Sequence, residues 1–164
     1  MLISKAMNTK LNDQIANELG ASQAYLAMAC MFEDLGLKAL AAHFRRQTEE
    51  ERGHALKIID YVINVSGVVK LGALTAPKSD YPTAKAAIDA ALKHELKVTS
   101  DINDLMALAE KERDYAPRSF LQWFVDEQVE EVSSMEHLLR IAEMAGVNLL
   151  QLESYVRHML APKS

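Results

Sequence analysis

Four stretches of this 164-residue chain each carry a seam, that is, a row of mainly apolar residues along one face of a predicted helix, and each seam contains one glutamate. A histidine follows one of these glutamates three residues later. The glutamates are Glu18, Glu51, Glu95 and Glu131, and the histidine is His54. Residues along each seam alternate spacings of four and three, which places them on one face of a helix. A buried, unpaired carboxylate costs several kcal/mol or takes up a proton, so four that converge require a compensating cation. The pattern therefore predicts a buried site for two divalent metal ions.

Glu51 and His54 form the most specific local motif, because residues at i and i+3 of a helix can reach the same ion. A single pair of this kind is common by chance and usually lies at the surface. Its place inside an apolar seam, with acids in the other three seams, favours a metal site. Carboxylates with one imidazole and no thiolate suit iron or manganese better than structural zinc, and the histidine disfavours calcium. Iron is the metal that we expect.

The helical period covers most of the chain and breaks at residues 67–81. The first helix is predicted over about residues 8–35, and the second ends near residues 66–67. About 15 extended residues can span roughly 50 Å, whereas a helix of roughly 29 residues is about 43 Å long, so the break can cross a bundle from end to end. We predict an all-α, ferritin-like four-helix bundle with one long crossover between helices two and three. It forms a single domain over residues 1–164, with the bundle at about residues 8–145.

Prolines and a glycine delimit the later helices. Pro82 and Pro117 are expected at the first positions of the third and fourth helices, and the fourth helix is expected to stop at Gly146. Asn148 is then the predicted cap of a short fifth helix at about residues 148–160, which has its own apolar stripe.

Composition excludes several classes of function. The formal net charge of −5 and the pI of about 5.5 argue against a nucleic-acid partner and suit a protein that attracts cations. No apolar run approaches the length of a bilayer span, and the N-terminal run MLISKAMNTK lacks a signal-peptide core, so we expect a soluble, cytoplasmic protein without a membrane partner. Cys30 is the only cysteine, which excludes an internal disulfide, and we expect it to be a buried apolar filler.

Four runs of the sequence resemble the non-haem bacterial ferritins, and together they cover nearly the whole chain. They are NELGASQAYLAMA, EEERGHALKIIDY, HELKVTSDI and LQWFVDEQVEEV. The tail AEMAGVNLLQLESYV resembles actinobacterial-type members in particular. The resemblance implies an iron-storage protein that oxidises Fe(II) to Fe(III) with dioxygen or peroxide. It also implies a homo-oligomeric shell of 24 subunits that holds a ferric mineral, and an electron donor that releases the iron.

The resemblance also implies a ligand set. One iron is held by Glu18, Glu51 and His54, with Glu51 bridging to the second. The second iron is held by Glu95 and Glu131, with Gln128 alongside. Symmetric di-iron proteins repeat the Glu-x-x-His motif on the fourth helix, whereas this chain has Ser134 three residues after Glu131. We therefore expect the second iron to be held more loosely and the ferric product to leave for the interior.

Further residues match family positions near the centre. Glu50, Glu127 and Glu130 match a third iron site of some prokaryotic ferritins, and a solvated acidic surface is the alternative. Tyr25 and Trp123 resemble positions thought to supply electrons or hydrogen bonds to the centre. For Trp123, simple packing is an equal alternative.

Rival interpretations come from the same fold class and from outside it. In a haem-containing bacterioferritin the haem-ligating methionine would fall at the position of Arg52, so we predict no haem. A non-catalytic helical scaffold would use the seam acids only to set register. A DNA-shielding mini-ferritin places its ligands across a subunit interface and lacks the fifth helix.

Overall fold

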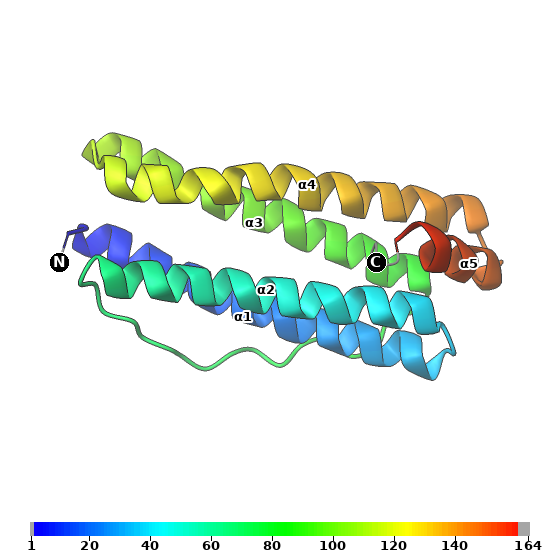
Figure 1. Cartoon of the computed structure of the whole chain (residues 1–164). Helices are drawn as coiled ribbons and strands as arrows, with labels where there is room; N and C mark the ends of the chain where they lie inside the picture. Colours follow the sequence, from blue (N-terminus) through cyan, green and yellow to red (C-terminus); the bar gives the residue numbers. More distant parts are fainter. Residues whose placement is uncertain (1, 161–164) are drawn as a thin grey trace.

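The computed structural model describes residues 2–160, which form five helices and, within that range, no strand. The four long helices are α1 (Lys5–Asp34), α2 (Lys38–Asn64), α3 (Ala84–Glu112) and α4 (Tyr115–Ala145), and the short helix is α5 (Leu149–Met159). Helices α1 and α2 form one antiparallel hairpin, α3 and α4 form the other, and α5 lies across the end of the bundle where α4 ends (Figure 1). The predicted all-α bundle with one long crossover and a short fifth helix is confirmed.

The crossover between α2 and α3 runs along the whole length of the bundle (Figure 1). Two asparagines of α1 hold its first part. Asn8 exchanges two hydrogen bonds with the backbone of Val68, at 2.9 and 3.1 Å, and Asn12 Oδ1 accepts one from Lys70 N at 2.6 Å. These amides therefore satisfy backbone groups of an extended segment that belongs to no sheet.

Two predicted helix starts are wrong by two residues. The N-cap of α3 is Thr83, whose hydroxyl accepts a hydrogen bond from Ala86 N at 3.0 Å, so Pro82 precedes the helix. The N-cap of α4 is Asp114, so Pro117 is the third helical residue and is buried. A threonine or aspartate oxygen caps a helix better than proline starts one, and the missing proline N–H is tolerated in the first turn.

The predicted end of α4 and cap of α5 agree with the structure. Gly146 is the C-cap of α4 and has a φ of 57°, in the left-handed region that favours glycine. Asn148 is the N-cap of α5, and its side chain accepts a hydrogen bond from Gln151 N at 3.3 Å.

Helix α5 docks on the bundle through an apolar stripe and several polar contacts, one of which caps α2. The N-cap of α2 is Leu37, whose side chain cannot accept a hydrogen bond. The buried carboxylate of Glu153 on α5 does so instead, because it accepts from Ala39 N at 2.5 Å and from Leu40 N at 3.1 Å. A carboxylate is favoured at a helix N-terminus. The contact therefore ties α5 to the start of α2.

Buried side chains form two apolar clusters, one toward each end of the bundle. The cluster at the α5 end includes Phe32 and Phe44, and the cluster at the N-terminal end includes Leu11 and Ile58. Between them each long helix contributes buried polar residues. The fold therefore leaves a polar layer in the middle of the four-helix core, between the two apolar clusters.

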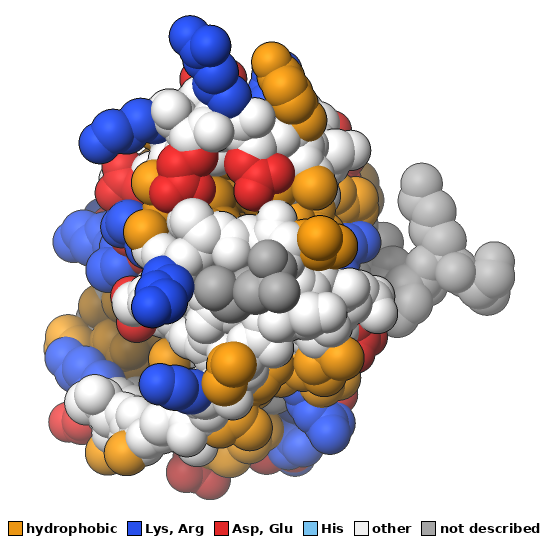
Figure 2. Space-filling view, turned by 90° about the vertical axis from the view of Figure 1, so that its left-hand side faces the viewer, with side chains coloured by type: hydrophobic (Ala, Val, Ile, Leu, Met, Phe, Trp, Pro, Cys, Tyr) orange, Lys and Arg blue, Asp and Glu red, His pale blue; other side chains and the backbone are white. Residues whose placement is uncertain are grey.

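The surface carries charges of both signs. Figure 2 shows the end of the bundle near the N-terminus, where acidic and basic side chains lie among scattered apolar ones. Among the helices of residues 2–160, none combines the length and hydrophobicity of a membrane span. Cys30 is exposed, so the prediction of a buried filler is wrong. It lies between the buried positions Ala29 and Phe32 of α1 but points away from the core.

Candidate metal centre

The four seam glutamates all lie in the central polar layer, one on each long helix. Their exposed fractions are 0% for Glu18, 1% for Glu51, 0% for Glu95 and 8% for Glu131. Burial of these side chains follows from the seam spacing, because each is flanked by core residues of its own helix. Four carboxylates removed from water within one layer demand protons, hydrogen-bond donors or cations.

Glu18, Glu51 and His54 bring one ligand atom each to within 4.8 Å of one another. His54 Nδ1 lies 3.6 Å from Glu51 Oε2 and 3.8 Å from Glu18 Oε2. Glu18 Oε2 and Glu51 Oε1 are buried and have no hydrogen-bond partner within residues 2–160. Unpaired, buried carboxylate oxygens beside an imidazole nitrogen are the donor set that a divalent transition metal requires. The residues present therefore fit an iron ion.

Protons compete with a metal at this group. Burial raises the pKa of Glu51 to about 9. Burial opposes the charged form of His54, but the carboxylates of Glu18 and Glu51 outweigh it and raise the pKa of His54 to about 10. Burial also acts to raise the pKa of Glu18, but His54, Glu51 and Gln14 together lower it. A protonated imidazole cannot bind a metal, so an incoming ion must displace protons from this group.

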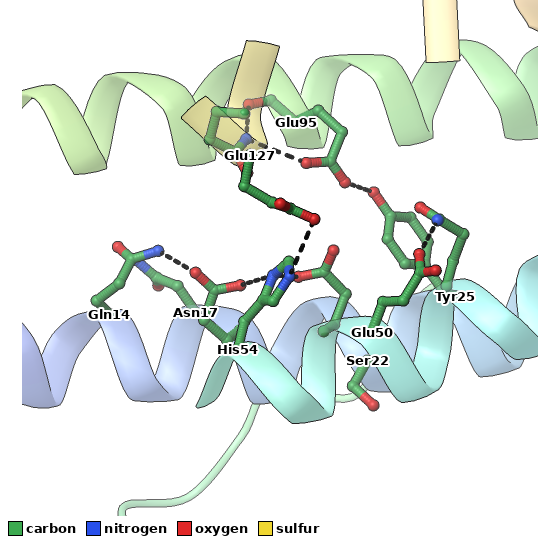
Figure 3. A network of polar contacts seen from close by, with 12 residues as sticks. Gln14, Asn17, Ser22, Tyr25, Glu50, His54, Glu95 and Glu127 are labelled. Carbon is green, nitrogen blue, oxygen red and sulfur yellow. Dashed lines mark hydrogen bonds and ion pairs between the residues drawn. The ribbon is translucent and has the colours of Figure 1, made fainter. Parts of the chain in front are cut away.

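Glu95, on the opposite hairpin, has hydrogen-bond donors on both carboxylate oxygens. The hydroxyl of Tyr25 donates to Oε1, and Nε2 of Gln128 lies 3.2 Å from Oε2 (Figure 3). Burial, followed by the charge of Glu95, raises the pKa of Tyr25 well above its ordinary value, so the phenol keeps its proton. The sequence-predicted positions Tyr25, Glu95 and Gln128 therefore meet in one hydrogen-bonded cluster.

Glu131 lies one turn after Gln128 on α4. Burial, with a further contribution from the charge of Glu95, raises the pKa of Glu131 to about 7. Near neutral pH this side chain is therefore divided between its acid and its carboxylate forms. Together with Glu95 and Gln128 it makes up the α3–α4 side of the polar layer.

The three acids expected at a third iron site are not part of the group of ligand atoms that lie within 4.8 Å of one another in residues 2–160. Glu127 points to the centre, with Oε1 4.0 Å from His54 Nε2 (Figure 3). Glu50 accepts a hydrogen bond from Gln47, and burial raises the pKa of Glu50. Glu130 is exposed. Glu127 is thus placed to hold the second nitrogen of the imidazole, a role that sequence reasoning did not assign to it.

Trp123 packs against the centre from α4. Its ring centroid is 5.4 Å from that of His54 in an edge-to-face arrangement, and Nζ of Lys57 lies 3.6 Å from its centroid. The indole is 37% exposed. Packing of the imidazole and a cation–π contact account for its position.

One buried contact of the centre was missed by sequence reasoning. Gln14 is buried and donates a hydrogen bond from Nε2 to Glu18 Oε1 at 2.7 Å. The signal was available, because Gln14 lies four residues before Glu18 and is a polar residue next to the apolar seam positions Leu11 and Ile15. A polar residue in that place calls for a buried partner.

An all-α bundle with one long crossover, and with buried acids from all four helices around one histidine, defines the ferritin-like class of helical proteins. The model of the ferritin-like domain matches residues 8–145, and the chain belongs to the ferritin family. Family membership supports a function in iron storage. The predicted resemblance to non-haem and actinobacterial-type ferritins is confirmed by the relatives of the chain.

The chain is similar to ferritins from several organisms. It is 39% identical over 160 residues to ferritin BfrB of Mycolicibacterium smegmatis, and this match covers 95% of this chain and 88% of the relative. It is 34% identical over 160 residues to the bacterial non-heme ferritin of Staphylococcus haemolyticus, and this match covers 98% of this chain and 96% of the relative. Its fold matches the open pore ferritin of Archaeoglobus fulgidus with a TM-score of 0.93 at 37% identity, over 96% of this chain and 98% of that one.

Proposed function

We propose that this ferritin oxidises Fe(II) to Fe(III) at a di-iron centre inside each subunit and stores the ferric product within a cytoplasmic homo-oligomeric shell of 24 subunits. The observation that carries the proposal is that Glu18 and Glu51 each keep one buried oxygen without a hydrogen-bond partner in the described part of the chain, while both carboxylates lie within 3.8 Å of His54 Nδ1. Family membership supplies the class of metal and the storage role.

Each hairpin holds one iron in this proposal. Glu18, Glu51 and His54 bind the first, and Glu51 also bridges to the second. Glu95 and Glu131 bind the second, with Gln128 alongside. Support comes from the carboxylate-rich donor set with one imidazole, which suits iron.

The reaction must balance electrons and protons. Two Fe(II) ions give one electron each, and dioxygen takes both with two protons to become hydrogen peroxide. Two further Fe(II) ions can reduce that peroxide to water with two more protons. Glu131 can exchange protons with the site near neutral pH, because its pKa lies at about 7.

The scaffold interpretation is less favourable on physical grounds. A helical scaffold without a metal would keep Glu18 Oε2 and Glu51 Oε1 buried without a hydrogen bond in residues 2–160, with the protonated imidazole of His54 as the charge that compensates these acids. The bacterioferritin interpretation meets a different difficulty. The position expected for its haem ligand is Arg52, which is exposed and lies 3.8 Å from Glu49.

Aerobic addition of a ferrous salt to the purified assembly tests the proposal. The expected result is a transient visible absorption followed by a soluble amber product, formed faster than in buffer. Precipitation at the rate of buffer alone would support the scaffold, and a Soret band in the purified protein would support a bacterioferritin. Size-exclusion chromatography of the same sample measures the shell, and a species much smaller than 24 subunits contradicts that part of the proposal.

A matched pair of variants ties the activity to the centre. Glu18→Gln removes one charge and one ligand oxygen at the site. Glu153→Gln makes the same change at a buried glutamate that caps α2. The proposal requires loss of oxidation in the first variant and retention in the second.

A further inference from the structure

Gln14 touches the centre without belonging to the expected ligand set. Its amide nitrogen donates to Glu18 Oε1 at 2.7 Å, and its side chain is only 2% exposed. The other oxygen, Glu18 Oε2, has no hydrogen-bond partner in the described range and lies 3.8 Å from His54 Nδ1. The amide thus occupies one oxygen of Glu18 and leaves the other facing the imidazole.

The orientation of the Gln14 amide is itself determined by neighbours. Asn17 Nδ2 lies 3.5 Å from Gln14 Oε1 and 3.2 Å from Asp101 Oδ2, so it donates toward both. Lys97 Nζ donates to the same Asp101 oxygen at 2.5 Å. Because the amide oxygen of Gln14 faces a donor, its amide nitrogen must face Glu18. A chain of hydrogen bonds therefore runs from a partly exposed ion pair on α3 to the buried carboxylate on α1.

We propose that Gln14 is a positioning residue for metal binding: it holds Glu18 so that one oxygen alone is presented to the first iron, and Asn17 with Asp101 holds Gln14. The inference rests on the proposed function of Glu18, Glu51 and His54 as the first site. Groups that orient a metal ligand typically contribute a factor of about 10 to 100 in metal affinity.

The opposite hairpin makes the assignment specific. Glu95 also accepts from an amide, that of Gln128, but its second oxygen accepts from Tyr25. Gln14 therefore differs from Gln128 in leaving its glutamate half free. The bond from Gln14 fixes one oxygen of Glu18 and leaves the other, which lies 3.8 Å from His54 Nδ1, available to a cation.

Co(II) titration of the assembled, iron-stripped protein under argon, followed by visible absorption, tests the inference without turnover. The variant is Gln14→Met, which keeps the length of the side chain and removes the donor. Its matched control is Ser22→Ala, which removes another buried hydrogen bond of α1, from Ser22 Oγ to Thr48 O at 2.8 Å. Thermal unfolding of each variant without metal reports the loss of stability separately.

The expected result is a Kd for the tighter class of Co(II) sites that is about 10- to 100-fold weaker in Gln14→Met and unchanged in Ser22→Ala. In a Glu18→Gln background, Gln14→Met should have no further effect, because the amide acts through Glu18. An unchanged Kd in Gln14→Met, or an equal loss in Ser22→Ala, overturns the inference.

Asn17→Ala provides a second variant at a partly exposed position if Gln14→Met does not fold. It should weaken the same class by a smaller factor, because Gln14 keeps its bond to Glu18 but loses the donor that orients it. An unchanged Kd in Asn17→Ala would contradict the proposed role of the hydrogen bonds that lead from Asp101 through Asn17 to Gln14. Wild-type protein that binds no Co(II) would instead overturn the proposed function, so the two failures are distinguishable.

Discussion

The α1–α2 half and the α3–α4 half of the centre differ in how their carboxylates are satisfied. In the first half, Glu18 and Glu51 each keep one buried oxygen without a hydrogen-bond partner among residues 2–160, and His54 stands between them. A metal ion that binds these two oxygens has to displace protons, but no hydrogen bond of the described structure. This half is arranged to receive a cation.

The second half is closed by hydrogen bonds. Both oxygens of Glu95 accept, from Tyr25 and from Gln128, and Glu131 has a pKa of about 7. An ion entering here must displace a hydrogen bond, a proton or both. On the proposed function, the difference means that the first iron binds more tightly and that the second is the one that leaves more easily after oxidation.

Removal of the imidazole should have the largest effect. His54→Ala deletes the one nitrogen ligand of the proposed set and leaves Glu18 and Glu51 facing each other as a buried pair of acids. We expect the initial rate of Fe(II) oxidation, measured by stopped-flow absorption, to fall by about 100-fold or more. His158→Ala, at an exposed histidine of α5, is the control. A His54→Ala rate close to wild type would break the distinction between the two halves.

The affinity of the first half should rise steeply with pH. The pKa values of Glu51, at about 9, and of His54, at about 10, mean that both groups hold protons near neutral pH. Each proton displaced by a metal strengthens apparent binding by about tenfold per pH unit. Co(II) titrations between about pH 6 and about pH 8 should therefore show at least this slope for the tighter class of sites. A flat profile would show that the imidazole is not a ligand.

The same protons affect the iron-stripped fold in the opposite direction. The folded-state pKa of His54 lies above its ordinary value of 6.5, so its contribution is fully present below about pH 6.5 and is lost as pH rises toward about 10. Glu51 has a folded-state pKa of about 9 against an ordinary value of 4.5, so the unfolded chain ionises first and stability also falls over that window. Thermal unfolding should thus show a falling Tm from about pH 6 to about pH 9, and added Co(II) should stabilise more at the higher pH. A Tm that rises over this range contradicts the assignment.

Disabling the second half should leave the first intact. Glu131→Gln removes a carboxylate with a pKa of about 7 and keeps the size of the side chain. We expect the weaker class of Co(II) sites to disappear, the tighter class to keep its Kd, and Fe(II) oxidation to slow by about tenfold. Equal loss of both classes would show that the halves bind as one unit.

The seams predicted the polar layer because helix geometry alone decides which residues share a face. Glu18, Glu51, Glu95 and Glu131 are therefore buried where the spacing of three and four places them. The bundle with one long crossover could also be predicted, because the non-helical segment after α2 is long enough to span the length of the bundle. The period of the helix is a property of the backbone, and the burial of these glutamates follows from that period and the positions of the apolar residues.

Features that depend on side-chain direction or on competition between caps could not be obtained in this way. Glu127 turns toward His54, whereas Glu130, three residues later, is exposed, and only the packing of α2 against α4 decides between them. Helix α4 starts after Asp114 and not at Pro117, because the side-chain oxygen of Asp114 is the stronger signal for a helix start. Cys30 faces outward although its neighbour Ala29 is buried, because one residue turns a helix face by about 100°.

The smallest effect is expected at Tyr25, and it tests why the second half is closed. Tyr25→Phe keeps the ring, which packs edge-on against Phe44 with centroids 5.8 Å apart, and removes the hydroxyl that donates to Glu95. If the hydroxyl only holds Glu95 until an ion arrives, Co(II) binding to the weaker class should tighten and oxidation should change by less than about tenfold. If the phenol instead supplies a proton or an electron, oxidation should slow and its products change while Co(II) affinity stays the same. Unchanged binding together with unchanged kinetics would remove both roles, and the closure of the α3–α4 half would then rest on Gln128.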